Sequence, residues 1–265
     1  MPEKQPVQPA LPRPQVLVSA HRCGAGDDPQ GENSLHALEH SVALGADFVE
    51  FDVRRRADGH LIVAHDLPDD GVEVLAYDAL LEALSDRAGA HIDLKFGSPA
   101  ELYDQVGACW EVEVVKRALK RLPADRIVAT TGRERAARAL RDWADAEGIP
   151  LLVGLSVGSS LRGLGPGAAF ASLLRQLTPD ARFDRSRANV VCANHGLALL
   201  RLRRFARRRG LRLLVWTVDG PALLRWWMRP GAAWMVTTNH PALALRDRRR
   251  ARRRAERRTP ARMRP

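Results

Sequence analysis

The stretch DFVEFDVRRRADGHLIVAH, residues 47–65, decides the fold that we predict for this chain. It holds two apolar runs, DFVEFDV (47–53) and LIVAH (61–65), and the residues Ala57-Asp58-Gly59-His60 stand between them. An Asp-Gly pair between two apolar runs is a strong signal for a β-hairpin, and the connection is too short for a crossover helix. The stretch therefore predicts two adjacent antiparallel strands.

Seven other short apolar runs surround this hairpin in the sequence, and most of them alternate with stretches of helical periodicity. These runs are VLVSA (16–20), HIDLK (91–95), RIVAT (126–130), PLLVGLSV (150–157), NVVCA (189–193), RLLVWTV (212–218) and AWMVTT (233–238). Apolar strands that alternate with helices indicate a parallel sheet covered by helices.

With the hairpin counted as one unit, the strands and helices make eight βα repeats. We therefore predict an α/β fold, a (β/α)8 TIM barrel with a β-hairpin at the second strand and no large insertion domain. A doubly wound open sheet is the alternative. That fold calls for a G-x-G-x-x-G loop after a strand, and the sequence has none.

Two carboxylates and an imidazole are predicted to gather on one face of the hairpin. If Asp58 and Gly59 are the two turn residues, Asp52 faces His65 across the strands, and Glu50 lies on the same face. Carboxylates this close repel unless a proton or a cation lies between them. Oxygen ligands at this spacing suit Mg²⁺, Ca²⁺ or Mn²⁺.

Two further strand ends carry candidate functional residues. His21-Arg22 ends the first apolar run, and an arginine there offers a planar fork for phosphate oxygens. Lys95 follows Asp93 by two residues at the end of another run, so both side chains can face the same side. The carboxyl ends of barrel strands are where active sites lie. His91 begins that run, so we expect it at the opposite end of the barrel with no role in the site.

The charge of the chain is concentrated at one end. The 265 residues carry a formal net charge of +11, but residues 246–265 alone hold eleven arginines against Asp247 and Glu256, a net charge of +9. We therefore predict a flexible Pro-rich leader over 1–15, a folded body over 16–245 and a basic, disordered tail over 246–265. The body is nearly neutral, which argues against a protein built to bind nucleic acid.

The apolar stretches and the cysteines of the sequence indicate the cellular compartment in which we expect the protein. No uninterrupted apolar stretch approaches the length of a transmembrane helix, and the Pro-rich start has no apolar core of the kind found in secretory signals. Three widely spaced cysteines fit a reduced environment and form neither a disulfide framework nor a zinc site. We expect a cytoplasmic protein.

Several motifs together resemble those of the glycerophosphodiester phosphodiesterase family. HRCG (21–24), GENS (31–34) and the stretch from Gly45 to Asp66 are similar to the family's HRG, PENT, ELDV, DG and HD motifs in order and spacing. HIDLK (91–95) resembles its E-x-K strand, and the segment 213–241 resembles its closing part, which runs from WTVN to T-D-x-P. The resemblance covers 16–245; the block 16–66 is the most specific part, and the middle, 100–190, matches only as alternating strands and helices.

The resemblance implies a role for each of ten residues. His21 and His65 would be the general acid and base, and Glu50, Asp52 and Asp93 would hold one divalent cation, which could be Mg²⁺, Ca²⁺ or Mn²⁺. Arg22 and Lys95 would bind the phosphate, Trp216 would line the substrate mouth, and Glu32 and Asn33 would shape the pocket. The sequence departs from the family at Asp93, where glutamate is usual, and at Cys23, where the family has the glycine of HRG.

The implied function is metal-dependent hydrolysis of a small-molecule phosphodiester, in glycerol or lipid metabolism. Glycerophosphodiesters, or lysophospholipid-like diesters, would give glycerol 3-phosphate or the matching phosphomonoester and an alcohol. A catalytically weakened barrel that binds a phosphorylated ligand or partner is the alternative. We expect no specific nucleic-acid partner, and for the basic tail either a solvated extension or weak attraction to anionic membrane or nucleic acid. The head group, the metal, the nucleophile and the oligomeric state stay open.

Overall fold

All nine predicted strands are present in the computed structural model, which describes residues 15–69, 72–158, 163 and 165–258. Eight of them, all but β3, close into a parallel barrel in the order β1-β2-β4-β5-β6-β7-β8-β9, with β9 pairing β1. The strands are β1 (Leu17–Ala20), β2 (Phe48–Arg55), β3 (Leu61–Val63), β4 (Gly89–Leu94), β5 (Ile127–Thr131), β6 (Leu152–Val157), β7 (Val190–Asn194), β8 (Arg212–Trp216) and β9 (Met235–Thr238). The predicted (β/α)8 TIM barrel is confirmed.

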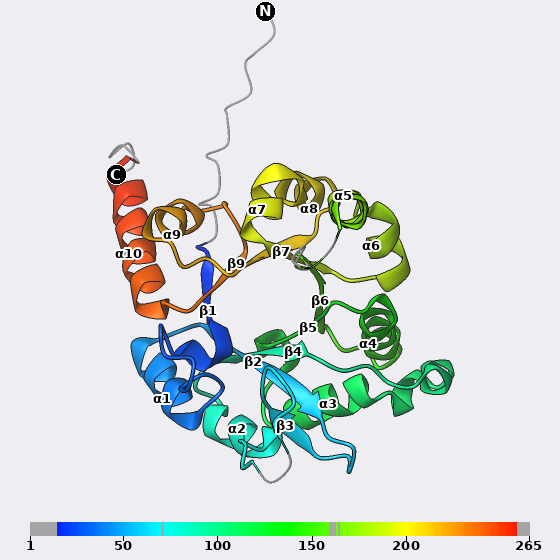
Figure 1. Ribbon diagram of the computed structural model, residues 1–265. Helices are drawn as coiled ribbons and strands as arrows, with labels where there is room; N and C mark the ends of the chain where they lie inside the picture. The colour runs from blue at the N-terminus through cyan, green and yellow to red at the C-terminus, as the bar shows by residue number, and fades with distance from the viewer. Residues whose placement is uncertain (1–14, 70–71, 159–162, 164, 259–265) are drawn as a thin grey trace, which may run out of the picture.

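Helices form a ring around the strands (Figure 1). They are α1 (Leu35–Leu44), α2 (Tyr77–Leu84), α3 (Trp110–Leu119), α4 (Glu134–Ala146), α5 (Pro166–Leu177), α6 (Asp180–Ser186), α7 (His195–Leu197), α8 (Arg203–Arg208), α9 (Pro221–Trp227) and α10 (Pro241–Arg258). The short turns are η1 (His21–Gly24), η2 (Ala100–Asp104), η3 (Val106–Ala108), η4 (Ala124–Arg126) and the π-helical η5 (Ala198–Leu202). Local sequence explains the start of α1, where the Ser34 side chain accepts a hydrogen bond from the Ala37 amide.

The strands bury both of their faces, in two separate apolar clusters. The outward face packs against the helices in the larger cluster. The smaller cluster fills the amino end of the barrel interior with side chains from six strands: Phe48, Val128, Leu152, Val190, Cys192, Leu214 and Met235. Gly89 leaves the space for the Phe48 ring, because a Cβ at Gly89 would lie 2.4 Å from that ring. The amino end of the barrel is therefore closed by apolar side chains.

The hairpin forms as predicted, but its predicted register is wrong by one residue. Arg54 pairs with Ile62, and the amide of Arg56 donates to the carbonyl of His60, so Ala57, Asp58 and Gly59 make a three-residue turn. Gly59 has a φ of 93°, the left-handed conformation that closes a three-residue loop of this kind. Asp52 is consequently opposite Ala64, whose amide donates to the Asp52 carbonyl, and not opposite His65.

The predicted disordered tail is wrong for residues 246–258, which continue helix α10. Ala244 and Leu245 are buried against the barrel, and Asp247, four residues after Leu243, is only 4% exposed. Alanine and arginine are both strong helix formers, and no glycine or proline interrupts the helix before Pro260. Residues 1–14 of the predicted leader and 259–265 of the tail lie outside the described residues. Among the described helices, none is both long and apolar enough to cross a membrane.

Candidate active site

A cavity of about 500 Å³ opens at the carboxyl end of the barrel. Seven of the ten residues predicted for the site line it: His21, Arg22, Glu50, His65, Asp93, Lys95 and Trp216. Asp52, Glu32 and Asn33 are joined to these residues by ion pairs and hydrogen bonds. The structure thus brings all ten together, from segments that are more than 190 residues apart in the sequence.

The turn after β1 aims a backbone donor at the site. Arg22 and Cys23 have positive φ angles of 45° and 67°, which are unfavourable for residues other than glycine. In this strained turn the Arg22 amide donates to Glu50 Oε2 at 2.6 Å. Gly24 follows with a φ of 84°, and a Cβ there would lie 2.2 Å from Ser41 Oγ. The turn therefore tolerates Cys23 but requires the glycine one position later.

Three carboxylates converge inside the barrel mouth. One oxygen from each of Glu50, Asp52 and Asp93 lies within 4.8 Å of the others. Glu50 and Asp52 project from β2, and Asp93 projects from β4, where it is in register with Asp52. Asp93 therefore reaches the same point as the other two, although its side chain is shorter than the glutamate that the resemblance leads one to expect.

Two cations already interact with this acidic cluster. Lys95 Nζ lies 3.0 Å from Asp52 Oδ1 and 2.5 Å from Asp93 Oδ2, and Arg22 Nε lies 3.4 Å from Asp52 Oδ2. Burial alone raises the pKa of Asp52, but Lys95, Asn33 and Arg22 outweigh it and the pKa is lowered. The pKa of Lys95 is raised, because Asp93 and Asp52 outweigh the effect of its burial.

Glu50 is the acid whose charge is least compensated. Its burial, followed by the neighbouring charges of Asp52 and Asp93, raises its pKa well above the usual range. A carboxyl group in this condition either holds a proton or requires a cation beside it. The donor set of three carboxylates fits a hard divalent cation, so the residues present are suited to the metal that the resemblance implies.

His21 is held by a chain of hydrogen bonds from the closing strand. Asp219 accepts bonds from both the backbone amide and the side-chain Nδ2 of Asn239, at 2.8 and 3.0 Å. This fixes the amide of Asn239 with its Oδ1 toward His21 Nδ1, 2.8 Å away, so Nδ1 carries the proton. His21 Nε2 is left as an acceptor, 3.9 Å from Glu50 Oε2. Burial, supported by Arg22, lowers the pKa of His21 and keeps the ring neutral.

His65 reaches the cavity from a different position than we predicted. It lies past the end of β3, and its carbonyl accepts a 2.7 Å hydrogen bond from Arg54 Nε. Its side chain is 40% exposed, and its Nδ1 lies 2.9 Å from Asp66 Oδ2. The same contact lowers the pKa of Asp66. His21 is therefore half-buried beside a neutral amide, whereas His65 is open to solvent beside a carboxylate.

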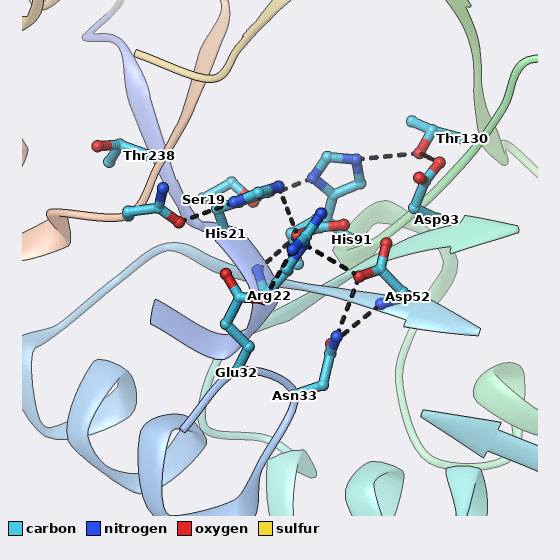
Figure 2. Close-up of polar contacts among 12 residues, drawn as sticks. Ser19, His21, Arg22, Glu32, Asn33, Asp52, His91, Asp93, Thr130 and Thr238 are labelled. Carbon is cyan, nitrogen blue, oxygen red and sulfur yellow. Dashed lines mark hydrogen bonds and ion pairs between the residues drawn. The ribbon is translucent and has the colours of Figure 1, made fainter. Parts of the chain in front are cut away.

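Glu32 and Asn33 hold the arginine and one acid in place (Figure 2). Arg22 Nη1 donates to Glu32 Oε2 at 2.6 Å. Asn33 Nδ2 donates to Asp52 Oδ2 at 3.0 Å, while Asn33 Oδ1 accepts the Asp52 amide at 3.2 Å. This double contact fixes the Asp52 carboxylate relative to its own backbone, so the pocket-shaping expectation has a concrete geometric form.

Our expectation for His91 is wrong, because this residue lies inside the cavity. It belongs to the inward-facing set of β4, two residues before Asp93, and strand alternation would have revealed this. His91 Nδ1 lies 3.0 Å from Ser19 Oγ, and its Nε2 lies 3.2 Å from Thr130 Oγ1. Thr130 Oγ1 in turn donates to Asp93 Oδ1 at 2.8 Å. Figure 2 shows this buried chain of bonds ending on an acid of the cluster.

The far wall of the cavity offers polar atoms that have no protein partner. Trp216 Nε1 and Thr237 Oγ1 are both buried and form no hydrogen bond within the described part of the chain. Both residues line the cavity. Buried donors of this kind require a partner, so this wall is suited to a ligand that brings hydrogen-bonding groups.

Sequence comparison with known proteins finds similarity in the first third of the barrel. Residues 21–95 match the model of the Glycerophosphoryl diester phosphodiesterase family. A glycerophosphodiester phosphodiesterase of Caldanaerobacter subterraneus subsp. tengcongensis is 45% identical over 51 residues, which are 19% of this chain and 20% of that protein. A lysophospholipase D of Mus musculus is 41% identical over 51 residues, 19% of this chain and 15% of that protein. The matched part therefore spans a fifth or less of these relatives.

Similar solved structures extend over the whole barrel. A glycerophosphodiester phosphodiesterase from Parabacteroides distasonis has a TM-score of 0.65 and 18% identity over 92% of this chain and 99% of its own. An Oleispira antarctica phosphodiesterase in complex with its product sn-glycerol-3-phosphate has a TM-score of 0.62 and 18% identity over 89% and 97%. The fold is thus shared throughout. Residues 21–95 are thus similar in sequence to the glycerophosphodiester phosphodiesterase family, and the barrel around them has the fold of solved structures that carry this name.

Proposed function

We propose that this chain hydrolyses glycerophosphodiesters, or lysophospholipid-like diesters, to glycerol 3-phosphate or the matching phosphomonoester and an alcohol. The observation that carries the proposal is the convergence of two histidines, three carboxylates, Arg22 and Lys95 on one cavity at the carboxyl end of the barrel. A phosphodiester is anionic, and its transition state places more charge on the phosphoryl oxygens.

A divalent cation held by Glu50, Asp52 and Asp93 would supply positive charge for the phosphoryl oxygens and orient the diester. Arg22 and Lys95 contribute two further cations of different geometry. The Arg22 guanidinium presents a planar fork to two oxygens, and the Lys95 ammonium acts as a point charge. Glu32 keeps the guanidinium directed at the site through its ion pair with Arg22 Nη1.

Proton transfer is divided between the two histidines according to their partners. His21 Nε2 is an unprotonated acceptor, so His21 serves as the general base and takes the proton of the nucleophile. The nucleophile is water or the neighbouring glycerol hydroxyl, whose oxygen forms the new P–O bond. Attack by the hydroxyl gives a cyclic phosphate, which a water molecule then opens to the monoester by breaking one of its ring P–O bonds. His65 lies on the same cavity, and the contact of its Nδ1 with Asp66 Oδ2 orients the ring, so His65 serves as the general acid. It donates its proton to the alkoxide that departs as the old P–O bond breaks.

The unpaired polar atoms of Trp216 and Thr237 supply the remaining recognition. They lie in the cavity but outside the charged cluster, so they are suited to hydroxyl groups of the substrate. The competing hypothesis is a weakened barrel that only binds a phosphorylated ligand. The ion pairs of Lys95 with Asp52 and Asp93 favour it to the extent that the lysine competes with a cation for the same oxygens.

One assay series distinguishes the two hypotheses. Purified protein is incubated with glycerophosphocholine, glycerophosphoinositol and a lysophosphatidylcholine, each with Mg²⁺, Ca²⁺ or Mn²⁺ and with a chelator. We expect turnover that the chelator abolishes and that Glu50→Gln reduces by about a hundredfold or more. Glu82→Gln is the matched control, because Glu82 is exposed on α2 away from the cavity.

Two results would contradict the proposal. Absence of turnover with every diester and every metal, combined with tight binding of glycerol 3-phosphate, establishes the binding hypothesis. Equal loss of activity in Glu50→Gln and Glu82→Gln removes the acidic cluster from the mechanism. Measurement of released glycerol 3-phosphate and of the free alcohol confirms which P–O bond is broken.

A further inference from the structure

A second concave site lies between helices α9 and α10, which stand side by side in Figure 1. It is a cavity of about 550 Å³, and its lining includes four arginines: Arg225, Arg229, Arg250 and Arg254. Among the residues of its lining that the structure describes, Asp247 is the only acidic one. The hydrolytic function proposed above uses none of these residues.

The four arginines come from two segments of the chain. Arg250 and Arg254 are four residues apart on α10 and share one side of that helix, while Arg225 belongs to α9 and Arg229 follows the end of α9 at Trp227. Like charges four residues apart on a helix repel, and here such a pair lines the same hollow as two further arginines. Asp247 lies 3.8 Å from Arg250 but also 4.0 Å from Arg246, so its single charge is already shared. The hollow keeps an excess of positive charge.

Several arginines on other faces of the barrel are paired with carboxylates. Arg87 lies 2.6 Å from Glu39, and both Arg182 and Arg185 lie within 2.8 Å of Glu134. By contrast, Arg225, Arg229 and Arg254 have no carboxylate within 4.0 Å among the side chains that the structure describes. Convergent guanidinium groups with so little counter-charge are what an anion site requires.

The position of this hollow separates it from the active site. Arg248, one turn before Ala251 on α10, contacts the Val16 carbonyl and Asp47, which precede β1 and β2. That part of α10 therefore lies at the amino end of the barrel, whereas the hydrolytic cavity opens at the carboxyl end. A ligand in the hollow cannot be the diester undergoing hydrolysis.

We propose that this hollow, named here the α9–α10 groove, binds a ligand that carries two or more phosphate groups. Each guanidinium can donate two parallel hydrogen bonds to phosphate oxygens, and four of them match a ligand with several phosphates better than a single monoanion. The volume suits a compact phosphorylated group. Free polyphosphorylated compounds and clustered lipid head groups share this chemistry.

The experiment compares two variants of equal charge change in the full chain. The groove variant combines R225Q, R229Q, R250Q and R254Q. The control variant combines R201Q, R204Q, R207Q and R208Q, which removes four exposed arginines from α8 and the turn before it. Binding of inorganic tripolyphosphate is measured by calorimetry. We expect the groove variant to bind at least about tenfold more weakly than both the parent and the control.

A second arm identifies the source of the phosphate groups. The three proteins are sedimented with phosphatidylglycerol vesicles, with and without tripolyphosphate. Sedimentation that tripolyphosphate competes away and that only the groove variant loses assigns lipid head groups. Tripolyphosphate binding without sedimentation assigns a free phosphorylated compound.

The proposal is overturned if the parent does not bind tripolyphosphate or if both variants lose equal affinity. Equal loss would reveal attraction by overall charge, and salt-sensitive binding of duplex DNA that both variants weaken alike would indicate the same. Hydrolysis of a soluble diester by the groove variant is measured alongside and should match that of the parent. The groove and the hydrolytic function are thus tested independently.

Discussion

The two ends of the barrel interior differ in composition, although the same strands build both. At the amino end, Phe48, Val190 and Met235 fill the interior with apolar groups. Two or more residues further along these strands and their neighbours, the inward positions are Glu50, His91, Thr130 and Thr237, and the cavity opens above them. Side chains of one face recur every second residue, so a strand can stabilise the barrel at one end and bring charged groups together at the other.

The largest effect is expected from removing His21, the proposed general base, at the polar end of the barrel interior. His21→Ala should lower kcat for a glycerophosphodiester by about a thousandfold, since general base catalysis contributes on this scale. Its midpoint of urea unfolding should stay near that of the parent, because the half-buried His21 ring lines the cavity and belongs to neither apolar cluster. His40→Ala on the exposed face of α1 is the matched control. Retained activity in His21→Ala would remove this residue from the mechanism.

At the apolar end of the barrel interior, truncation of a side chain to alanine should lower the stability of the fold and leave catalysis unchanged. Phe48→Ala removes a ring that packs over Gly89 and against Trp234, and we expect the free energy of unfolding to fall by about 3–5 kcal/mol. Phe48→Leu should cost less, because much of the volume is retained. Both are measured by urea titration. At a temperature where the variants are folded, kcat/KM should be unchanged, and a parallel loss of activity would show that the two ends are not independent.

The buried imidazole of His91, in the middle of the barrel, should make the free energy of unfolding depend on pH. Burial lowers the pKa of His91 to about 3, from an ordinary value of 6.5 in the unfolded chain. Below about pH 6.5 the unfolded state binds a proton that the folded state does not, so stability falls as the pH drops toward 3. This one group contributes a slope of up to about 1.4 kcal/mol per pH unit in that window and nothing above it.

Urea unfolding at about pH 7, 6 and 5 measures this slope. His91→Gln keeps hydrogen-bonding atoms at the position but removes the titration, so its stability should decline less steeply with acid. His21, whose pKa is also lowered by burial, acts in the same direction and accounts for part of what remains. An identical slope in the parent and His91→Gln would contradict the assignment.

The smallest expected effect concerns the hydrogen bond from Thr130 to Asp93, one of the three carboxylates of the acidic cluster. Thr130→Val removes the hydroxyl that donates to Asp93 and preserves the shape of the side chain. We expect the affinity for Mn²⁺, measured by calorimetry, to fall by about tenfold, since partners of ligating carboxylates contribute on this scale. Thr130→Ser retains the hydroxyl and should bind Mn²⁺ like the parent. Equal affinities in all three proteins would mean that Asp93 needs no such support.

Much of this architecture was predictable from local pattern. Each of the nine strands is a short run of apolar residues, and the Asp58-Gly59 pair identified the hairpin. The hairpin register was not predictable, because Asp-Gly fits both a two-residue and a three-residue turn, and the choice moves His65 to another position. The role of His91 followed from the same alternation that places Asp93, but its place near the start of the strand concealed it.

Contacts across the closed barrel were beyond local pattern. The chain Asp219–Asn239–His21 joins residues about 200 positions apart, so no motif spacing could specify it. The helix over 246–258 agrees with the helix propensity of its alanines and arginines, and it continues from Ala244 and Leu245, which are buried against the barrel. We predicted a solvated tail from the charge of this stretch.

The amino-acid sequence was enough to predict the alternation of strands and helices and the hairpin, because strand periodicity and turn chemistry are local properties. The ten candidate site residues came from these patterns together with the resemblance to a known family. Only the tertiary structure decided which partners those residues have. Closure of the barrel brings Asn239 to His21 and Thr130 to Asp93, and it places Arg225 and Arg250 in the lining of one groove. Charge, protonation and binding depend on such through-space neighbours, and distance along the chain does not determine them.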